Sequence, residues 1–237
     1  MAPIPQNLIP AQETKRLEAI RQYDVAKSLQ EAVFSEFVVL TARIFSLPIS
    51  LIALVDETQV WYKANVGLPS VKSQPREEAL CSTAILEDKV VVYADLATEQ
   101  SPLITPEAAS AAHNKELRFY AAAPICMPDK SRIGSLCVID RQPRSFSPDE
   151  QSLLNQIASL VSHMVAVRHC FLCTPGLGEY HWIALRQQIQ EELQELAALV
   201  RYLLYRHGTH VPVATDVVGL ISRRLNDLRE VLDQQES

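Results

Sequence analysis

The feature that most constrains the fold is a pair of apolar segments within residues 118–140, RFYAAAPICMPDKSRIGSLCVID. The pattern predicts two strands of about nine residues each, joined by a turn at residues 128–131. A hairpin with one face in water alternates apolar and polar side chains, whereas both of these strands are apolar almost throughout, with small residues at their centres. We therefore expect other elements or a ligand to cover both faces of this hairpin.

Around the hairpin, the sequence predicts one α+β domain, residues 12–173, preceded by a loose, proline-rich arm, residues 1–11. The clearest local signal is a helix start at Ser147, because Pro148 follows the serine and Glu150 lies three residues after it. Expected helices cover residues 12–23, 28–46, 77–86, 106–112 and 147–170, further strands cover residues 49–56, 60–66 and 89–94, and residues 95–116 form a lid-like loop.

The C-terminal residues 179–237 have a different pattern, with apolar side chains spaced by three and four positions. These positions are Leu185, Ile189, Leu193, Leu196, Val200 and Leu203 in one helix and Val217, Ile221, Leu225, Leu228 and Val231 in the next. The two stripes predict an antiparallel helical hairpin. Such a hairpin cannot bury both stripes by itself, so we expect it to serve dimerisation or docking on a partner.

Overall composition excludes several classes of function. A net charge of −6 argues against a nucleic-acid or anionic-membrane surface, and no run of about 18 apolar residues predicts a membrane span. The N-terminus lacks the pattern of a secretory signal. Five cysteines without a repeated spacing suggest reduced thiols in the cytoplasm.

Four segments, in this order and spacing, closely resemble the bacterial GAF domain family: ARIFSLPISLIALVDETQVWYKANVGL, LCSTAIL, RFYAAAPI and IGSLCVIDRQPRSFSP. The resemblance covers residues 12–170, and none is found for the residues that follow. It implies a mixed, mainly antiparallel sheet between a bundle of terminal helices and a pocket-side layer of short helices and loops. It also implies a sensory or dimerising module of bacterial signal transduction.

The sequence departs from two branches of that family. Relatives that attach a bilin use a lid cysteine, and residues 95–116 contain none. Cyclic-nucleotide-binding relatives carry an Asn-Lys-Phe-Asp-Glu signature, of which residues 114–116 retain a fragment. The sequence therefore identifies neither a cofactor nor the small molecule that such a module would bind.

A turn centred between Asp129 and Lys130 places Cys137 opposite Ala122, and side chains then alternate between the two faces of the sheet. We assign the face with small residues and a carboxylate to the pocket, although a register slip of one residue would exchange the faces. The expected ligand-binding residues are Leu54, Asp56, Cys81, Phe119, Ala121, Ala123, Leu136, Val138 and Asp140. For Asp56 and Asp140 the simpler interpretation is that each ends a strand and accepts turn hydrogen bonds.

Candidate chemistry is sparse. Cys81, with Arg76 one or two turns earlier, could be a reactive thiol, but a buried core cysteine is the favoured interpretation. Some GAF-like enzymes reduce free methionine sulfoxide with lid and pocket cysteines, and this lid has none, so we expect no enzymatic activity. His169, Cys170, Cys173 and His181 have the spacing of half a zinc site, and we expect no metal there.

Two hypotheses follow. The first is a non-catalytic sensor of an unidentified small molecule, which forms a homodimer through its terminal helices and passes the signal to a partner protein. The second is a scaffold or interaction domain whose pocket is closed.

Overall fold

The computed structural model describes residues 4–68, 72–174, 176 and 178–234. Its centre is a six-stranded sheet in the order β3-β2-β1-β6-β5-β4, in which every described pair of neighbours is antiparallel. The strands are β1 (Ile49–Val55), β2 (Gln59–Val66), β3 (Ser73–Pro75), β4 (Val91–Tyr93), β5 (Phe119–Cys126) and β6 (Arg132–Asp140). The α+β architecture expected from the sequence is confirmed.

The apolar hairpin is β5 and β6, and its register is the predicted one, with Ala122 opposite Cys137 and Phe119 opposite Asp140. The register shifts only at the turn end, between Ile125 and Cys126. Because β6 also pairs with β1, the hairpin lies at the centre of the sheet. All seven residues of β1 are buried, and only the end residues of β5 and β6 are partly exposed, so both faces are covered.

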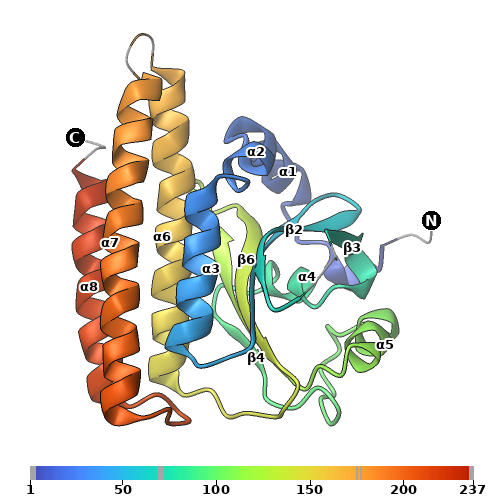
Figure 1. Cartoon of the computed structure of the whole chain (residues 1–237). Coiled ribbons are helices and arrows are strands. Elements are labelled where there is room, and N and C mark those ends of the chain that lie inside the picture. The colour runs from blue at the N-terminus through green and yellow to red at the C-terminus, as the bar shows by residue number, and fades with distance from the viewer. Residues whose placement is uncertain (1–3, 69–71, 175, 177, 235–237) are drawn as a thin grey trace.

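Helices cover the two faces of the sheet unequally, as Figure 1 shows. One face carries a bundle of long helices: α3 (Ala32–Ile44), α6 (Pro148–Cys173), α7 (Gly178–His207) and α8 (Thr215–Asp233). The other face carries a thin layer of short elements: η2 (Arg76–Glu78), α4 (Cys81–Ala84) and α5 (Pro106–Asn114). The N-terminal elements η1 (Gln6–Leu8), α1 (Glu13–Gln22) and α2 (Val25–Ser28) precede α3.

The predicted start of the long helix α6 is confirmed as a capping box. The Ser147 hydroxyl accepts a hydrogen bond from the Glu150 amide at 3.2 Å, and the Glu150 carboxylate accepts one from the Ser147 amide at 2.8 Å. By length and composition alone, α6 could cross a membrane, with half of its most apolar window buried inside the protein. Its packing against the sheet and α8 accounts for this apolar character, as in the core helix of a globular domain.

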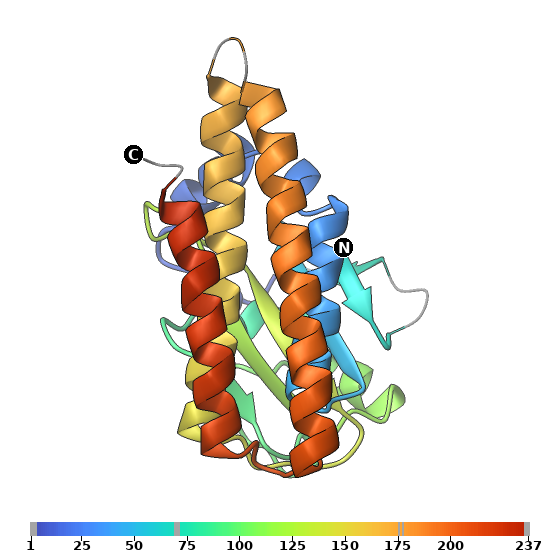
Figure 2. The same cartoon turned by 60° about the vertical axis from the view of Figure 1, so that its left-hand side comes forward.

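The C-terminal hairpin docks on the same chain. Apart from Val231, which is partly exposed, the residues of both apolar stripes are buried, and they form one continuous core with α3 and α6. Figure 2 shows α6, α7 and α8 side by side along the sheet. Polar contacts fix the arrangement, since the Trp182 indole donates to the Glu31 carboxylate at 3.0 Å and the Gln156 amide donates to Asn226 at 2.6 Å. The expectation that these stripes need a separate partner is therefore wrong, because α3 and α6 cover them.

The N-terminal arm is also anchored within its described part. Leu8 is buried, and its carbonyl accepts a hydrogen bond from the guanidinium of Arg76 at 2.7 Å. That buried guanidinium also pairs with Glu13 at 2.6 Å. Burial raises the pKa of Glu13, but the hydrogen bonds from Arg16 and Arg76 outweigh this and hold the pKa below its usual value. The arm expected to be loose is thus fixed to η2 by one buried cation, and residues 1–3 lie outside the described residues.

Candidate functional site

The two faces of the sheet belong to two separate hydrophobic cores, and this decides where a ligand could lie. The core beneath the long helices contains six of the predicted pocket residues. They are Leu54, Phe119, Ala121, Ala123, Leu136 and Val138. The core beneath α4 and α5 contains the opposite face of the same strands, including Leu51, Tyr120, Ala122 and Cys137. The register is the predicted one. The face that we assigned to the pocket from the sequence packs against the long helices, and the cavity lies on the opposite face.

The physical reason for the exchange is the close approach of α6. Ala121 and Ala123 lie on the face that α6 covers, where short side chains let a long helix pack closely on the strand. From the sequence, small side chains indicate space for a ligand, whereas in the fold they make space for a helix. Cys81 is the one predicted residue that lines the cavity on the other face, and whether any of the predicted residues binds a ligand stays a prediction.

Asp56 and Asp140 follow the simpler interpretation. The Asp56 carboxylate accepts a hydrogen bond from the Glu57 amide at 2.8 Å in the β1–β2 turn. The Asp140 carboxylate accepts one from the Arg141 amide at 2.6 Å where β6 ends. Neither side chain lines the cavity, so both carboxylates act within turns.

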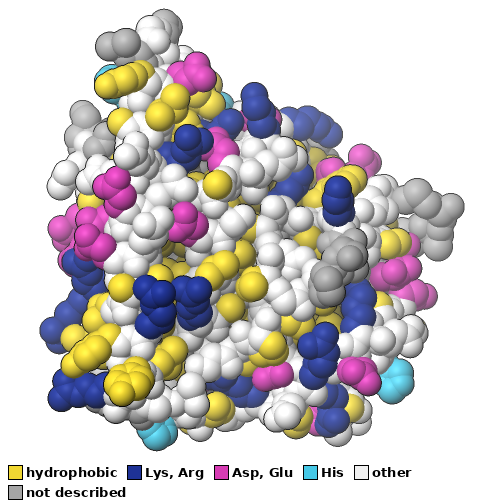
Figure 3. All heavy atoms as spheres, in the orientation of Figure 1, with side chains coloured by type: hydrophobic (Ala, Val, Ile, Leu, Met, Phe, Trp, Pro, Cys, Tyr) yellow, Lys and Arg dark blue, Asp and Glu magenta, His cyan; other side chains and the backbone are white. Residues whose placement is uncertain are grey.

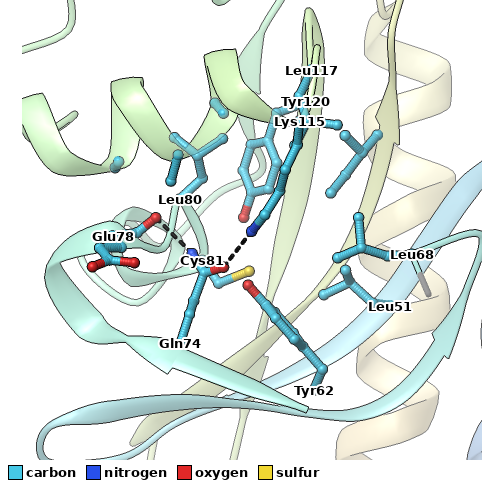
Figure 4. Close-up of a pocket in the computed structure, with 14 residues that line it drawn as sticks. Leu51, Tyr62, Leu68, Gln74, Glu78, Leu80, Cys81, Lys115, Leu117 and Tyr120 are labelled. Atoms are coloured by element: carbon cyan, nitrogen blue, oxygen red, sulfur yellow. Dashed lines mark hydrogen bonds between the residues drawn. The ribbon is translucent and has the colours of Figure 1, made fainter. Parts of the chain in front are cut away.

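The cavity lies between the sheet and the short-helix layer, and Figure 4 shows its walls. Its volume is about 30 Å³, which is room for a molecule the size of water. The sheet contributes Leu51, Tyr62, Tyr120 and Ile139, the η2–α4 segment contributes Glu78, Leu80 and Cys81, α5 contributes Ala108, Ala111 and Ala112, and Leu68, Gln74, Lys115 and Leu117 complete the wall. Apolar walls with a few polar groups are typical of small-molecule sites.

One hydrogen-bonded chain closes the side of the cavity next to the lid. The Lys115 ammonium, just beyond α5, donates to the Gln74 side-chain oxygen at 2.7 Å, and the Gln74 amide donates to the Glu78 carbonyl at 2.6 Å. Figure 4 shows both bonds as dashed lines. Burial lowers the pKa of Lys115, although Glu78 partly opposes this shift. An anionic ligand would compete with Gln74 for this ammonium group.

Two buried hydroxyl groups on the sheet face beneath the α4–α5 layer are poorly satisfied, and one of them, that of Tyr120, lines the cavity. Tyr120 is 1% exposed, and no described group makes a well-formed hydrogen bond with its hydroxyl, although the Cys81 thiol lies near it; the same holds for the hydroxyl of Ser135. Burial raises the pKa of Tyr120 well above its usual value, so the phenol stays protonated and can donate. Unpaired buried hydroxyls are costly, and they indicate a place where a polar guest would gain hydrogen bonds.

Among the described residues, the structure brings no further metal-ligating group to the segment with His169, Cys170, Cys173 and His181. His169 and Cys173 lie 3.7 Å apart, while Cys170 and Cys173 are both exposed. Within the described ranges, no group of three or more His, Cys, Asp and Glu side chains could hold a metal ion.

Sequence reasoning missed most of the cavity wall. Tyr120 carries a signal that could have been used, because it is the one polar aromatic residue of the alanine-rich strand and its hydroxyl needs a polar environment. Lys115 and Gln74 carry no such signal. They are 41 positions apart in the sequence, and only the folded structure brings them into contact.

Comparisons with known proteins agree with this architecture. A family model described as "GAF domain" matches residues 27–166. A curated cyclic di-GMP phosphodiesterase from Pseudomonas aeruginosa is 29% identical over 216 residues, which is 89% of this chain and 34% of that protein. The chain therefore spans about a third of this relative. Since residues 1–166 are too few to make up 89% of the chain, the match extends into the C-terminal helices.

Two of the solved structures that are similar to this chain are the following. The blue-light absorbing form of the Thermosynechococcus elongatus PixJ GAF domain is 17% identical, with a TM-score of 0.50 over 62% of this chain and 89% of that one. Free methionine-R-sulfoxide reductase from Neisseria meningitidis is 16% identical, with a TM-score of 0.46 over 60% of this chain and 81% of that one. Identities this low concern the fold and do not extend to activity.

Proposed function

The chain belongs to the GAF domain family, and from this premise we propose that it is a non-catalytic sensory module that binds a small molecule between its sheet and the α4–α5 layer. The observation that carries this proposal is the cavity with an unpaired, buried Tyr120 hydroxyl at its base and Lys115 at its lid side. Such a site offers one donor to a neutral oxygen and one cation to an anionic group.

The lining of the cavity favours binding over catalysis. No histidine is found among the described residues that line it. The described polar groups that act on the Cys81 thiol are hydroxyls, a second thiol and the Lys115 ammonium, and Glu78 is the one carboxylate among the described lining residues. The lid between β4 and β5 supplies no cysteine of the kind that the sulfoxide-reducing branch uses. Domains of this family are mostly non-catalytic.

The relative suggests a setting for the module. Because this chain matches about a third of a cyclic di-GMP phosphodiesterase, we infer that it acts as a regulatory input to a larger signalling protein or to a partner protein in the cytoplasm. The match beyond residue 166 suggests that the α7–α8 hairpin is part of this input unit. Strand β6 leads through residues 141–147 into α6, which gives the cavity a direct connection to the helices.

The second candidate is a scaffold with a closed pocket, and the small cavity volume of about 30 Å³ favours it. On this account Tyr62, Leu80 and Tyr120 act as core residues, and a ligand would have to displace the lid before it could enter. The sensor requires such an opening, whereas the scaffold does not.

A thermal-shift screen separates the two candidates. We expect at least one compound in a panel of bacterial metabolites to raise the melting temperature, because a ligand at 100 times its dissociation constant stabilises the folded state by about 2.7 kcal/mol. This corresponds to a rise of roughly 5–10 °C for a chain of this size, at about 2–4 °C per kcal/mol. A panel that includes amino acids, nucleotides and organic acids and produces no shift would favour the scaffold.

We further propose that the module dimerises through its terminal helices, now by their outer surface. A groove of about 430 Å³ lies between α3 and α7, lined by Val39, Leu193 and Ala197 with Arg43 and Arg201. On the face that Figure 3 shows, apolar side chains lie next to basic ones over these helices. A groove of this kind could accept an apolar helix face of a second copy.

Light scattering at increasing protein concentration is expected to give the mass of a dimer. Replacing the groove residue Ala197→Lys places a charge in the interface and should shift the equilibrium towards the monomer, because an unpaired charge is costly to bury. The matched control is Leu220→Lys on α8, where the side chain is 42% exposed and outside the groove. A wild-type protein that stays monomeric at high concentration would refute this part of the proposal.

A further inference from the structure

Two cysteines that lie 56 positions apart in the sequence meet beneath α4, beside the cavity that Cys81 lines. The sulfur atoms of Cys81, on α4, and Cys137, on β6, are 3.8 Å apart, and both side chains are buried. The sequence does not predict this pair, since neither spacing nor register relates α4 to the centre of the sheet. The pair is therefore a product of the fold.

The two sulfurs are close to the distance at which a disulfide can form. An S–S bond is about 2.05 Å long, so the sulfurs would need to approach each other by less than about 2 Å. Cys137 is held by strands on both sides, opposite Ala122 of β5 and Leu51 of β1. Cys81 begins the four-residue helix α4, which lies in the thin layer over the sheet. The adjustment would therefore fall on α4.

The cavity gives a small oxidant a place beside Cys81. Cys81 lines it, and its volume of about 30 Å³ suits a molecule of the size of water or hydrogen peroxide. The unpaired hydroxyls of Tyr120 and Ser135 lie close enough to the Cys81 sulfur to favour its thiolate. The Tyr120 hydroxyl, which lines the cavity, can also donate to a peroxide oxygen or to the leaving hydroxide. In Figure 4 the Cys81 sulfur is drawn between the hydroxyl ends of Tyr62 and Tyr120.

The pKa of the Cys81 thiol is lowered and that of the Cys137 thiol is raised, which indicates which of the two would react first. A hydrogen bond from Cys137 lowers the pKa of Cys81, and the nearby hydroxyls add to this effect, although burial opposes it. Burial raises the pKa of Cys137 well above its usual value. Because the thiolate is the nucleophile, Cys81 would react first and Cys137 would act as the resolving thiol.

We propose that Cys81 and Cys137 are a thiol–disulfide modification site that is oxidised by a peroxide. The Cys81 thiolate attacks one peroxide oxygen, the O–O bond breaks, and a protonated hydroxide leaves as water, so that Cys81 becomes a sulfenic acid. The Cys137 sulfur then attacks the Cys81 sulfur and displaces the hydroxyl group, which leaves as a second water. In total the two thiols lose two protons and two electrons, and one peroxide is reduced to two waters.

A Cys81–Cys137 disulfide would change the shape of the cavity. Glu78 and Leu80, in the segment that leads into α4, are part of the cavity wall, so drawing α4 towards β6 moves that wall. The chain would then report an oxidising signal through the same layer that covers the proposed ligand site. The inference does not depend on ligand binding, because its test measures thiols only.

The test uses a variant of residues 1–237 in which Cys126, Cys170 and Cys173 are replaced by serine, which leaves only the pair. After treatment with hydrogen peroxide, the protein is denatured, alkylated, digested and examined by mass spectrometry. We expect both thiols to become inaccessible to alkylation and one peptide pair, joined through Cys81 and Cys137, to appear and to be released by a reductant. Both natural thiols remain in this protein, so the result does not depend on the folding of a pair mutant.

Two single replacements in the same background test the order of events. In Cys137→Ser we expect Cys81 to stop at a sulfenic acid that a dione reagent traps, and in Cys81→Ser we expect Cys137 to stay a free thiol. Circular dichroism of each variant establishes that it is folded. The proposal is overturned if the pair remains fully alkylatable at a peroxide dose that oxidises the exposed Cys170 of the wild type. It is also overturned if Cys137 is oxidised as readily without Cys81.

Discussion

Replacing Arg144→Met is expected to lower the free energy of unfolding by about 3–5 kcal/mol, a large effect for a single polar replacement. The side chains of Arg144 and Glu150 form an ion pair and are 5% and 0% exposed. Removing the arginine leaves a carboxylate in the interior without its counterion, and that uncompensated burial is the source of the cost.

This ion pair connects four parts of the structure. The Arg144 guanidinium donates to the Phe45 carbonyl at the end of α3 at 2.6 Å, and the Arg144 amide donates to the Ala94 carbonyl after β4 at 3.0 Å. The Glu150 carboxylate closes the capping box of α6 and accepts a bond at 3.1 Å from the Val213 amide, which precedes α8. The loss should therefore loosen the attachment of the helical hairpin.

Urea unfolding followed by circular dichroism measures the effect, with Arg224→Met as the control. Arg224 is 38% exposed and pairs with Glu192, Glu195 and Asp227 on the surface, so its loss should cost no more than about 1 kcal/mol. If Arg144→Met costs no more than this control, the buried pair does not hold the hairpin as described.

Replacing Phe119→Ala is expected to cost about 3–5 kcal/mol of unfolding free energy, because the ring is fully buried beneath the long helices and a cavity would remain. Its centroid lies 5.6 Å from that of Phe146, which adds an aromatic contact. This prediction distinguishes the observed face assignment from the one expected from the sequence. A pocket residue would affect ligand binding much more than stability.

The adjacent residue provides a matched control for Phe119 on the opposite face. Tyr120→Phe removes only a hydroxyl that lacks a described partner, so its effect on stability should lie within about 1 kcal/mol. Both variants are compared by equilibrium unfolding in urea. If Phe119→Ala lowers the free energy of unfolding only slightly but abolishes ligand binding, the ligand site lies on the face that the sequence favours, and the present assignment is wrong.

The register of the central hairpin could be predicted because a short turn with Asp129 and Lys130 leaves one pairing that keeps the apolar segments together. The start of α6 could be predicted because Ser147, Pro148 and Glu150 act locally. These features depend on neighbours in the sequence, and the structure confirms them.

The side of the sheet that bears the cavity could not be predicted in this way. Strands buried on both faces carry apolar residues on both, so alternation does not say which face meets the long helices. The alanines 121 and 123 are compatible with a ligand or with a close helix, and α6 occupies that space. The pairing of Cys81 with Cys137 and that of Lys115 with Gln74 arise only when the layers meet.

The stripes of α7 and α8 show the same limit. Their spacing correctly predicts two helices and buried seams, since Ile189 and Ile221 are both fully buried. The spacing of apolar residues predicts that one face of a helix is buried, but it does not identify the element that packs against that face. In this fold α3 and α6 of the same chain provide it.

A matched pair of replacements in α5 tests whether a ligand binds between the sheet and this helix. Ala111 lines the cavity, whereas Ala109 is exposed on the same helix and does not. Thermal shifts are measured for wild type, Ala111→Phe and Ala109→Phe with a compound that stabilises the wild type. We expect Ala111→Phe to lose the shift because its ring fills the cavity, while Ala109→Phe retains it. An equal shift in both variants would place the ligand elsewhere and contradict the account.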